Sequence, residues 1–150
     1  MDEFITDWTA RNGTGRDQLL PLLHAVQKQA GYVHVAVVPL VAKALNLSRA
    51  DVHGVVTFYH DFRQTPPGRH VVKLCRAESC HARGGAAIEA QAAQRLGVAM
   101  GETRVDGAVS LEPVYCLGLC AIGPNALVDG RPVARVDGAA LDRIAAEVAA

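Results

Sequence analysis

The first 68 residues have their hydrophobic positions at the spacing of α-helices. Leucine and valine side chains recur from Leu19 to Val26 on one predicted helix face, and Gly31 stands where that helix would end. A second helical stretch is predicted over residues 36–45. The pattern therefore predicts a helical N-terminal domain over residues 1–68.

A further helix in this domain has the clearest start signal. Ser48 and Asp51 form a capping-box-like pair, in which each side chain can accept a hydrogen bond from the other's backbone N–H. The apolar positions that follow have the spacing of one buried helix face: Val52, Val55, Val56 and Tyr59. This spacing predicts Tyr59 in the core and leaves Phe58 and His60 as candidates for a partner surface.

After the segment 64–68, which contains Pro66 and Pro67, the pattern changes to alternating strands and helices. It predicts, in order, a strand at 70–74, a helix at 85–96, a strand at 109–115, a hairpin with strands at 126–128 and 132–136, and a helix at 139–148. The hairpin turn is Asp129-Gly130. This order predicts an α+β fold, in which residues 69–150 form a small sheet domain.

Charge and composition exclude some classes of partner. The chain has 15 basic and 15 acidic residues and no run of Lys or Arg. We therefore expect neither nucleic acid nor an anionic membrane as the main partner. The acidic start lacks the layout of a secretory signal, and no apolar run approaches the roughly 20 residues that span a bilayer. The sequence thus predicts a cytoplasmic protein without direct membrane insertion.

The cysteines carry the candidate chemistry. All of them lie in the second domain, as Cys75-x4-Cys80 and Cys116-x3-Cys120. Each pair begins where a predicted strand ends, so we expect both pairs at one edge of the sheet. Disulfides are rare in a reducing cytosol. The absence of a Cys-x-x-Cys motif argues against a stand-alone thiol enzyme.

Two kinds of site remain for these cysteines. Zinc sites usually use the tighter Cys-x2-Cys spacing, whereas a [2Fe–2S] cluster takes four thiolates. The spacing favours the cluster and leaves open a structural zinc module with four cysteine ligands and no redox chemistry. Gly118 and Gly123 are small enough for backbone N–H groups to approach the sulfur atoms, which would raise a cluster's reduction potential. His81 is expected to be exposed or to lie behind the ligands, and no motif predicts a catalytic residue.

Three segments of this chain resemble one family. Residues 75–80 (Cys-Arg-Ala-Glu-Ser-Cys), 115–124 (Tyr-Cys-Leu-Gly-Leu-Cys-Ala-Ile-Gly-Pro) and 44–59 are similar to the thioredoxin-like [2Fe–2S] ferredoxin family, which includes the 24 kDa subunit of respiratory NADH dehydrogenase. The resemblance implies a helical bundle followed by a thioredoxin-like domain, with a small mixed sheet flanked by helices. It also implies a [2Fe–2S] cluster with a defined ligand set: Cys75, Cys80, Cys116 and Cys120.

Within this family, the motifs most resemble the gamma subunits of soluble NAD-dependent, molybdenum-containing formate dehydrogenases. The resemblance implies an electron-transfer subunit that has no catalytic residue of its own. A 51 kDa-type partner subunit would hold FMN, NAD and a [4Fe–4S] cluster, with the FMN near the cluster of this chain. A large iron–sulfur subunit would hold the molybdenum cofactor and oxidise formate. NADH:quinone oxidoreductase and NAD-reducing hydrogenase contain equivalent subunits and are the alternatives.

Overall fold

The computed structural model describes residues 1–149. These residues form two compact units, divided between Pro66 and Pro67. Each unit has a hydrophobic core of its own. Within residues 1–149, no helix has the length and apolar character needed to cross a membrane.

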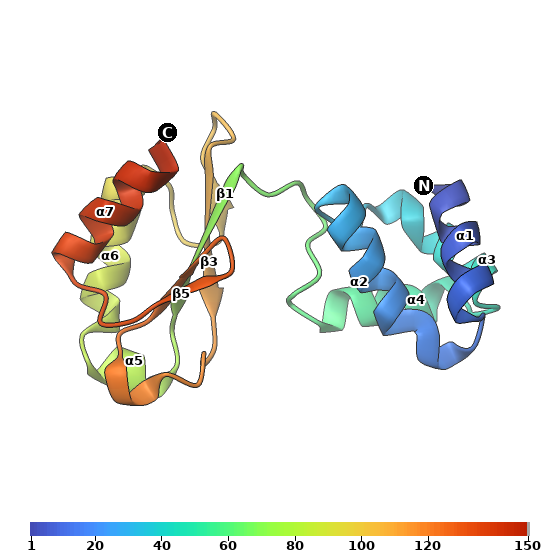
Figure 1. Cartoon of the computed structure of the whole chain (residues 1–150), viewed down its shortest axis with the longest axis horizontal. Helices are drawn as coiled ribbons and strands as arrows, with labels where there is room; N and C mark the ends of the chain where they lie inside the picture. Colours follow the sequence, from blue (N-terminus) through green and yellow to red (C-terminus); the bar gives the residue numbers. More distant parts are fainter. Residues whose placement is uncertain (150) are drawn as a thin grey trace. The chain divides into compact units, whose positions relative to one another are not determined.

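The first unit is entirely helical (Figure 1). Its elements are α1 (Asp2–Asn12), η1 (Arg16–Gln18), α2 (Leu19–Ala30), η2 (Val35–Val37), α3 (Val38–Ala44) and α4 (Arg49–Phe58). Gly31 ends α2 by adopting a left-handed φ of 84° and donating its N–H to Gln27 O. Ser48 and Asp51 form the predicted capping box at the start of α4. The apolar faces of the helices meet in one core that includes Ile5, Leu22, Leu23, Val26, Val41, Val52 and Val56.

The prediction that Tyr59 lies in this core is wrong. The α-helix ends at Phe58, and Tyr59 adopts an extended conformation with φ −88° and ψ 109°. Its side chain therefore leaves the valine face of α4 and is 44% exposed. Phe62 fills the core instead. Phe58 and His60 are both exposed, and whether they contact a partner stays a prediction.

The second unit is a five-stranded sheet with helices on one face (Figure 1). Its elements are β1 (His70–Cys75), α5 (Glu78–Ala82), α6 (Gly85–Leu96), β2 (Glu102–Thr103), β3 (Val109–Val114), η3 (Cys120–Ile122), β4 (Ala126–Val128), β5 (Arg131–Val133) and α7 (Gly138–Ala149). The strand order is β2-β3-β1-β4-β5, in which β1 and β3 are parallel and every other pair is antiparallel. The predicted α+β class, with a helical bundle before a small mixed sheet, is confirmed.

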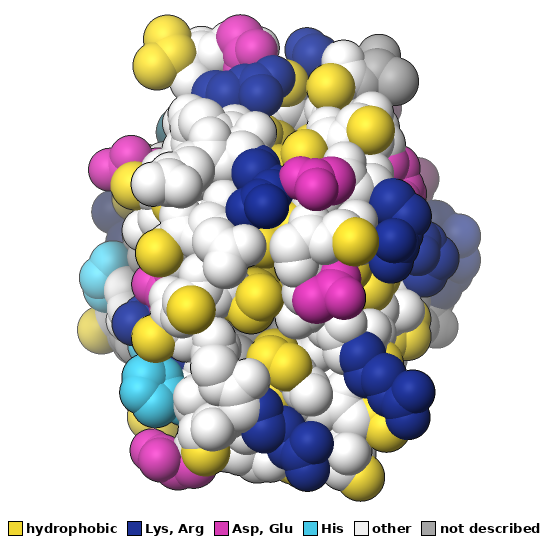
Figure 2. Space-filling view, turned by 90° about the vertical axis from the view of Figure 1, so that its left-hand side faces the viewer, with side chains coloured by type: hydrophobic (Ala, Val, Ile, Leu, Met, Phe, Trp, Pro, Cys, Tyr) yellow, Lys and Arg dark blue, Asp and Glu magenta, His cyan; other side chains and the backbone are white. Residues whose placement is uncertain are grey.

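The core of the second unit lies between the sheet and the α6–α7 layer. Alternate residues of β1 and β3 point into it, because successive side chains of a strand face opposite sides of a sheet. The buried set includes Val72, Leu74, Val109, Leu111, Ala92, Leu96, Leu141 and Ile144. On the outer surface of this layer, Figure 2 shows basic and acidic side chains interspersed. Arg95 on α6 pairs with Asp142 on α7 at 2.6 Å, and such mixing agrees with the zero net charge of the chain.

Candidate metal centre

The two cysteine pairs lie at one edge of the sheet, as predicted. Cys75 is the last residue of β1 and is paired with Val114, the last residue of β3. Cys116 follows two residues later, so the parallel pairing of the strands brings both cysteine segments to the same end. All four cysteines are free thiols, of which Cys75 and Cys80 are buried and Cys116 is exposed. Cys120 is half-buried at the start of η3.

The thiols form two pairs. Cys116 Sγ lies 3.7 Å from Cys120 Sγ. The thiols of Cys75 and Cys80 hydrogen-bond to each other. The charge of Cys75 also contributes to raising the pKa of the Cys120 thiol, so the two pairs lie within electrostatic range of each other. Among residues 1–149, no three His, Cys, Asp or Glu side chains form a compact group for a single metal ion.

Backbone N–H groups from both segments converge on the Cys75 sulfur. Burial raises the pKa of the Cys75 thiol, but hydrogen bonds from the backbone N–H groups of Ala77, Cys116 and Leu117, and from the Cys80 thiol, outweigh burial and lower it. Two of those N–H groups belong to the second cysteine segment. The Cys75 sulfur, at the end of β1, thus accepts hydrogen bonds from its own segment and from the loop after β3.

The partner thiols have the opposite shift. Burial and the hydrogen bond to Cys75 raise the pKa of the Cys80 thiol. The hydrogen bond to Cys116 and the charge of that residue raise the pKa of the Cys120 thiol. Within the first pair, Cys75 is therefore the sulfur that ionises first. Since metal ligation requires thiolates, binding of a metal group here releases protons.

The loop after β3 has a backbone that turns its N–H groups inward. Cys116 has a φ of 70° and Gly118 a φ of 76°, both in the left-handed region. The Gly118 N–H donates to Cys116 Sγ at 3.4 Å. Ser79 Oγ donates to Cys120 O at 3.3 Å and so ties this loop to the first cysteine segment. Backbone N–H groups in such turns form concave sites for negative charge.

Gly123 makes room for the Cys80 sulfur. A Cβ atom at this position would lie 3.1 Å from Cys80 Sγ. Because the φ of Gly123 is −70°, the backbone itself tolerates other residues, and only the close approach requires glycine. His81 is exposed, which is one of the two positions expected for it.

The comparisons with known proteins agree with this geometry. The family model described as thioredoxin-like [2Fe-2S] ferredoxin matches residues 5–149. The chain belongs to the thioredoxin-like [2Fe–2S] ferredoxin family. Membership confirms the predicted fold and the predicted cofactor, a [2Fe–2S] cluster.

Similar members of this family belong to NADH-quinone oxidoreductases. One such relative, from the NADH-quinone oxidoreductase of Escherichia coli K12, is 39% identical over 107 residues, which are 71% of this chain and 64% of the relative. The match therefore spans less than two thirds of the length of that relative. Another, from the NADH-quinone oxidoreductase of Rhizobium meliloti, is 35% identical over 144 residues, which are 96% of this chain and 86% of the relative.

The fold of this chain is also similar to that of a chain in a solved structure. The crystal structure of air-oxidised NAD⁺-reducing [NiFe]-hydrogenase contains a chain that superposes with a TM-score of 0.76 at 26% identity. The superposition covers 88% of this chain and 23% of the hydrogenase chain.

The residues at the sheet edge fit the family's cofactor. A [2Fe–2S] cluster takes four protein ligands, usually thiolates. The chain has four cysteines, and the structure gathers all of them in two pairs. The N–H groups around Cys75 and Cys116 offer hydrogen bonds to ligating sulfur atoms. The predicted ligand set is therefore compatible with the site in number, chemistry and position.

The sequence analysis missed Asn125, which is 3% exposed beside the cysteines. Its side-chain amide donates to Leu119 O at 2.8 Å and lies 3.5 Å from Cys80 Sγ. The available signal was a single polar residue between Gly123-Pro124 and an apolar strand. That position marks a buried polar group, but its contact with a cysteine 45 residues earlier depends on the fold.

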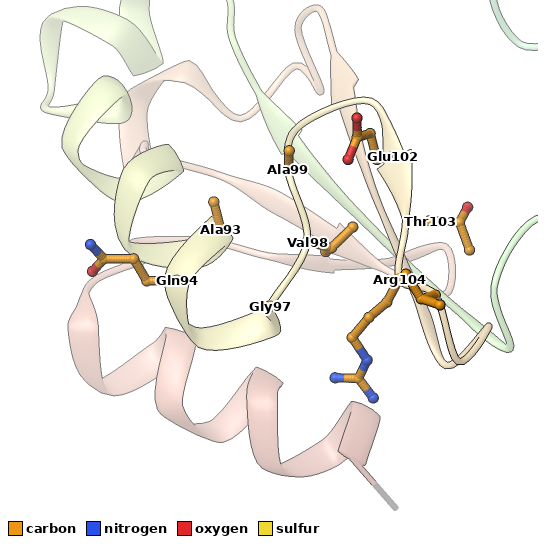
Figure 3. A pocket seen from close by; sticks show the side chains of 9 residues that line it. Ala93, Gln94, Gly97, Val98, Ala99, Glu102, Thr103 and Arg104 are labelled. Atoms are coloured by element: carbon orange, nitrogen blue, oxygen red, sulfur yellow. The ribbon is translucent and has the colours of Figure 1, made fainter.

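A separate hollow of about 410 Å³ lies between the end of α6 and β2 (Figure 3). Its lining includes Arg104 and contains no cysteine. Arg104 Nε pairs with Asp106 Oδ1 at 2.8 Å, and its Nη1 donates to Leu96 O at the end of α6. These bonds give Arg104 a structural role, because a cation stabilises the carbonyl end of a helix.

Proposed function

We propose that this chain is an electron-transfer subunit whose [2Fe–2S] cluster is bound by Cys75, Cys80, Cys116 and Cys120. The observation that carries the proposal is the parallel pairing of β1 and β3, which ends both strands beside one site. Two separate segments, one at the end of β1 and one after β3, then supply two thiols each. Backbone N–H groups of the segment after β3 donate to the Cys75 sulfur at the end of β1, so both cysteine segments are needed to form the site.

The division of labour follows from the side chains. When bound, the cluster supplies one-electron transfer, which the side chains of proteins perform poorly. The chain holds the thiolates, offsets their negative charge with N–H donors, and buries Cys75 and Cys80 away from water. The exposed Cys116 and Tyr115 lie on the open side of the site, where a redox partner can approach.

The partners in the proposal come from the resemblance and from the relatives. We propose a cytoplasmic complex in which a 51 kDa-type subunit holds FMN, NAD and a [4Fe–4S] cluster, with its FMN near this chain's cluster. The motifs at 75–80 and 115–124 extend the proposal to an NAD-dependent formate dehydrogenase, with a molybdenum cofactor and iron–sulfur centres in the large subunit. The similar chains come from NADH-quinone oxidoreductase and NAD⁺-reducing hydrogenase, and those complexes are the alternatives.

Anaerobic purification of the tagged full chain from its own organism tests the partners. We expect a flavin subunit and a molybdenum subunit in the same complex, together with formate-dependent reduction of NAD⁺. Quinone-linked or hydrogen-linked activity without formate oxidation would contradict the formate dehydrogenase assignment and leave the electron-transfer role intact. Recovery without a flavin subunit would contradict the partner proposal itself.

Metal analysis tests the cofactor ligands. Purified chain should contain iron and acid-labile sulfide in equal amounts, with visible absorption from the cluster. A colourless chain that contains zinc and neither iron nor sulfide would show that the site is the structural zinc module, the alternative from another class. The isolated chain should neither oxidise formate nor reduce NAD⁺, since the proposal assigns both reactions to partner subunits.

A further inference from the structure

Asn125 contacts three of the segments that carry the cysteines, although it is not itself a ligand. Its backbone oxygen accepts a hydrogen bond from the Cys75 N–H at 2.9 Å. Its side-chain Nδ2 donates to Leu119 O at 2.8 Å, one residue before Cys120. The same nitrogen lies 3.5 Å from Cys80 Sγ, within reach of a hydrogen bond to sulfur. One buried residue thus joins β1, α5 and the loop after β3.

The orientation of the Asn125 amide is determined by its neighbours. Leu119 O is an acceptor, so the amide must present nitrogen and not oxygen to it. Oδ1 then has no hydrogen-bond partner within residues 1–149, although it is fully buried. A buried amide oxygen without a partner lowers stability. The protein keeps this amide orientation although the unpaired Oδ1 lowers stability. In this orientation an Nδ2 hydrogen of Asn125 is directed at Cys80 Sγ.

That hydrogen matters most when Cys80 is a ligand. A neutral thiol is a weak acceptor, whereas a ligating thiolate is negatively charged and accepts stronger hydrogen bonds. Adding an electron to a cluster increases the negative charge on its sulfur ligands. A donor at Cys80 Sγ therefore stabilises the reduced cluster more than the oxidised one, which raises the reduction potential.

On the basis of the proposed cluster ligands, we propose that Asn125 is a positioning residue that raises the reduction potential of the [2Fe–2S] cluster through an Nδ2–H···Sγ hydrogen bond to Cys80. The Gly123 position supports this role, because a Cβ atom there would lie 3.5 Å from Asn125 Nδ2 and 3.1 Å from Cys80 Sγ. The chain therefore leaves space for the amide and the sulfur to meet.

A redox titration of the full chain with its reconstituted cluster tests the proposal. Asn125→Leu has a similar size and lacks the side-chain donor, whereas the backbone N–H of residue 125 remains beside Cys80. At the potential where the wild-type cluster is half reduced, the variant should show a roughly tenfold lower ratio of reduced to oxidised cluster, which is about 59 mV for one electron. Ser110→Ala is the matched control, since Ser110 is also buried and hydrogen-bonded but lies in β3 away from the cysteines. The potential of this control should stay at the wild-type value.

A second measurement needs no substitution in the site. The chain has three asparagines, and Asn12 and Asn46 belong to the first unit. Wild-type chain labelled with ¹⁵N only in asparagine side-chain amides should give a ¹⁵N hyperfine coupling in pulsed EPR of the reduced cluster. The coupling should persist in Asn12→Gln/Asn46→Gln, which assigns it to Asn125.

The possible outcomes separate the two proposals. No ¹⁵N coupling in the wild type, or an unchanged potential in Asn125→Leu, would overturn the role of Asn125 and leave the cluster ligands untouched. If Asn125→Leu fails to retain a cluster, the presence or absence of the ¹⁵N coupling in the wild type decides whether Asn125 has the proposed role. A wild-type chain that assembles no [2Fe–2S] cluster would overturn the proposed function and this inference with it.

Discussion

Replacing Gly123 with alanine tests how tightly the structure packs around the Cys80 sulfur. The added Cβ would lie 3.1 Å from Cys80 Sγ, whereas ordinary van der Waals contacts of a Cβ atom begin near 3.4 Å. Because the φ of Gly123 is −70°, alanine adds no backbone strain there. The sulfur must therefore move by a few tenths of an ångström, and it cannot move freely, since Cys80 is 1% exposed within α5.

The size of the effect follows from overpacking. Extra carbon atoms in a well-packed interior typically cost about 1–3 kcal/mol. For a unit of this size, each kcal/mol lowers the melting temperature by roughly 4–8 °C. We therefore expect the cluster of Gly123→Ala to lose its visible absorption at a temperature at least about 4 °C below that of the wild type.

Gly54→Ala is the matched control for this experiment. It adds the same methyl group in the middle of α4, where a Cβ would have no atom within 4 Å. Alanine is a better helix former than glycine. Gly54→Ala should therefore not lower the bleaching temperature, which is the temperature at which the cluster loses its visible absorption. If Gly123→Ala keeps the wild-type bleaching temperature and iron content, Cys80 Sγ has more room than the structure shows, and the packing argument is wrong.

Three other predictions concern the cysteine ligands, the turn at Asp129 and the helix cap at Ser48. Replacing any one of the four cysteines by serine should reduce the iron content of the purified chain, and an unchanged cluster in one variant removes that residue from the ligand set. Asp129→Ala should lower the bleaching temperature by an amount equivalent to about 1 kcal/mol, because Asp129 accepts the Val71 N–H at 2.7 Å and lies 2.7 Å from the His70 ring nitrogen. Asp129→Asn should lower the bleaching temperature by less, since asparagine tolerates the φ of 50° at this turn. Ser48→Ala should destabilise the first unit by about 1 kcal/mol through loss of the capping box, measured by the fluorescence of Trp8 during urea unfolding. A wild-type midpoint in that variant would show that the cap contributes nothing.

Local signals were sufficient for much of the secondary structure. Gly31 ends α2 and the Ser48–Asp51 capping box starts α4, because both depend only on the conformation and hydrogen bonds of a few consecutive residues. The strands at 70–75 and 109–114 also follow from their apolar residues and from the positions of the cysteines. Elements that are maintained by tertiary contacts were not predicted. The two-residue strand β2 is an example, since it is defined only by its pairing with β3.

The failure at Tyr59 has a similar cause. Helical spacing placed it on the valine face of α4, but the helix ends one residue earlier and the chain turns so that Phe62 enters the core. Periodicity identifies which residues would share a face if a helix continued. It does not determine where tertiary packing ends the helix.

For the site, the ligand chemistry could be predicted from the sequence: four cysteines in two close pairs, each beginning where a predicted strand ends. How these pairs are brought to one end of the sheet could not be predicted, because it depends on strand pairing. Parallel pairing of β1 with β3 aligns Cys75 with Val114, and this alignment lets the backbone of the second loop donate to the first sulfur. The antiparallel pairing of β1 with β4 places Asn125 beside Cys75 and allows it to reach Cys80, a contact across 45 residues. The spacing of cysteines is local and can be read from the chain, whereas the donors around the sulfurs come from segments that only the sheet brings together.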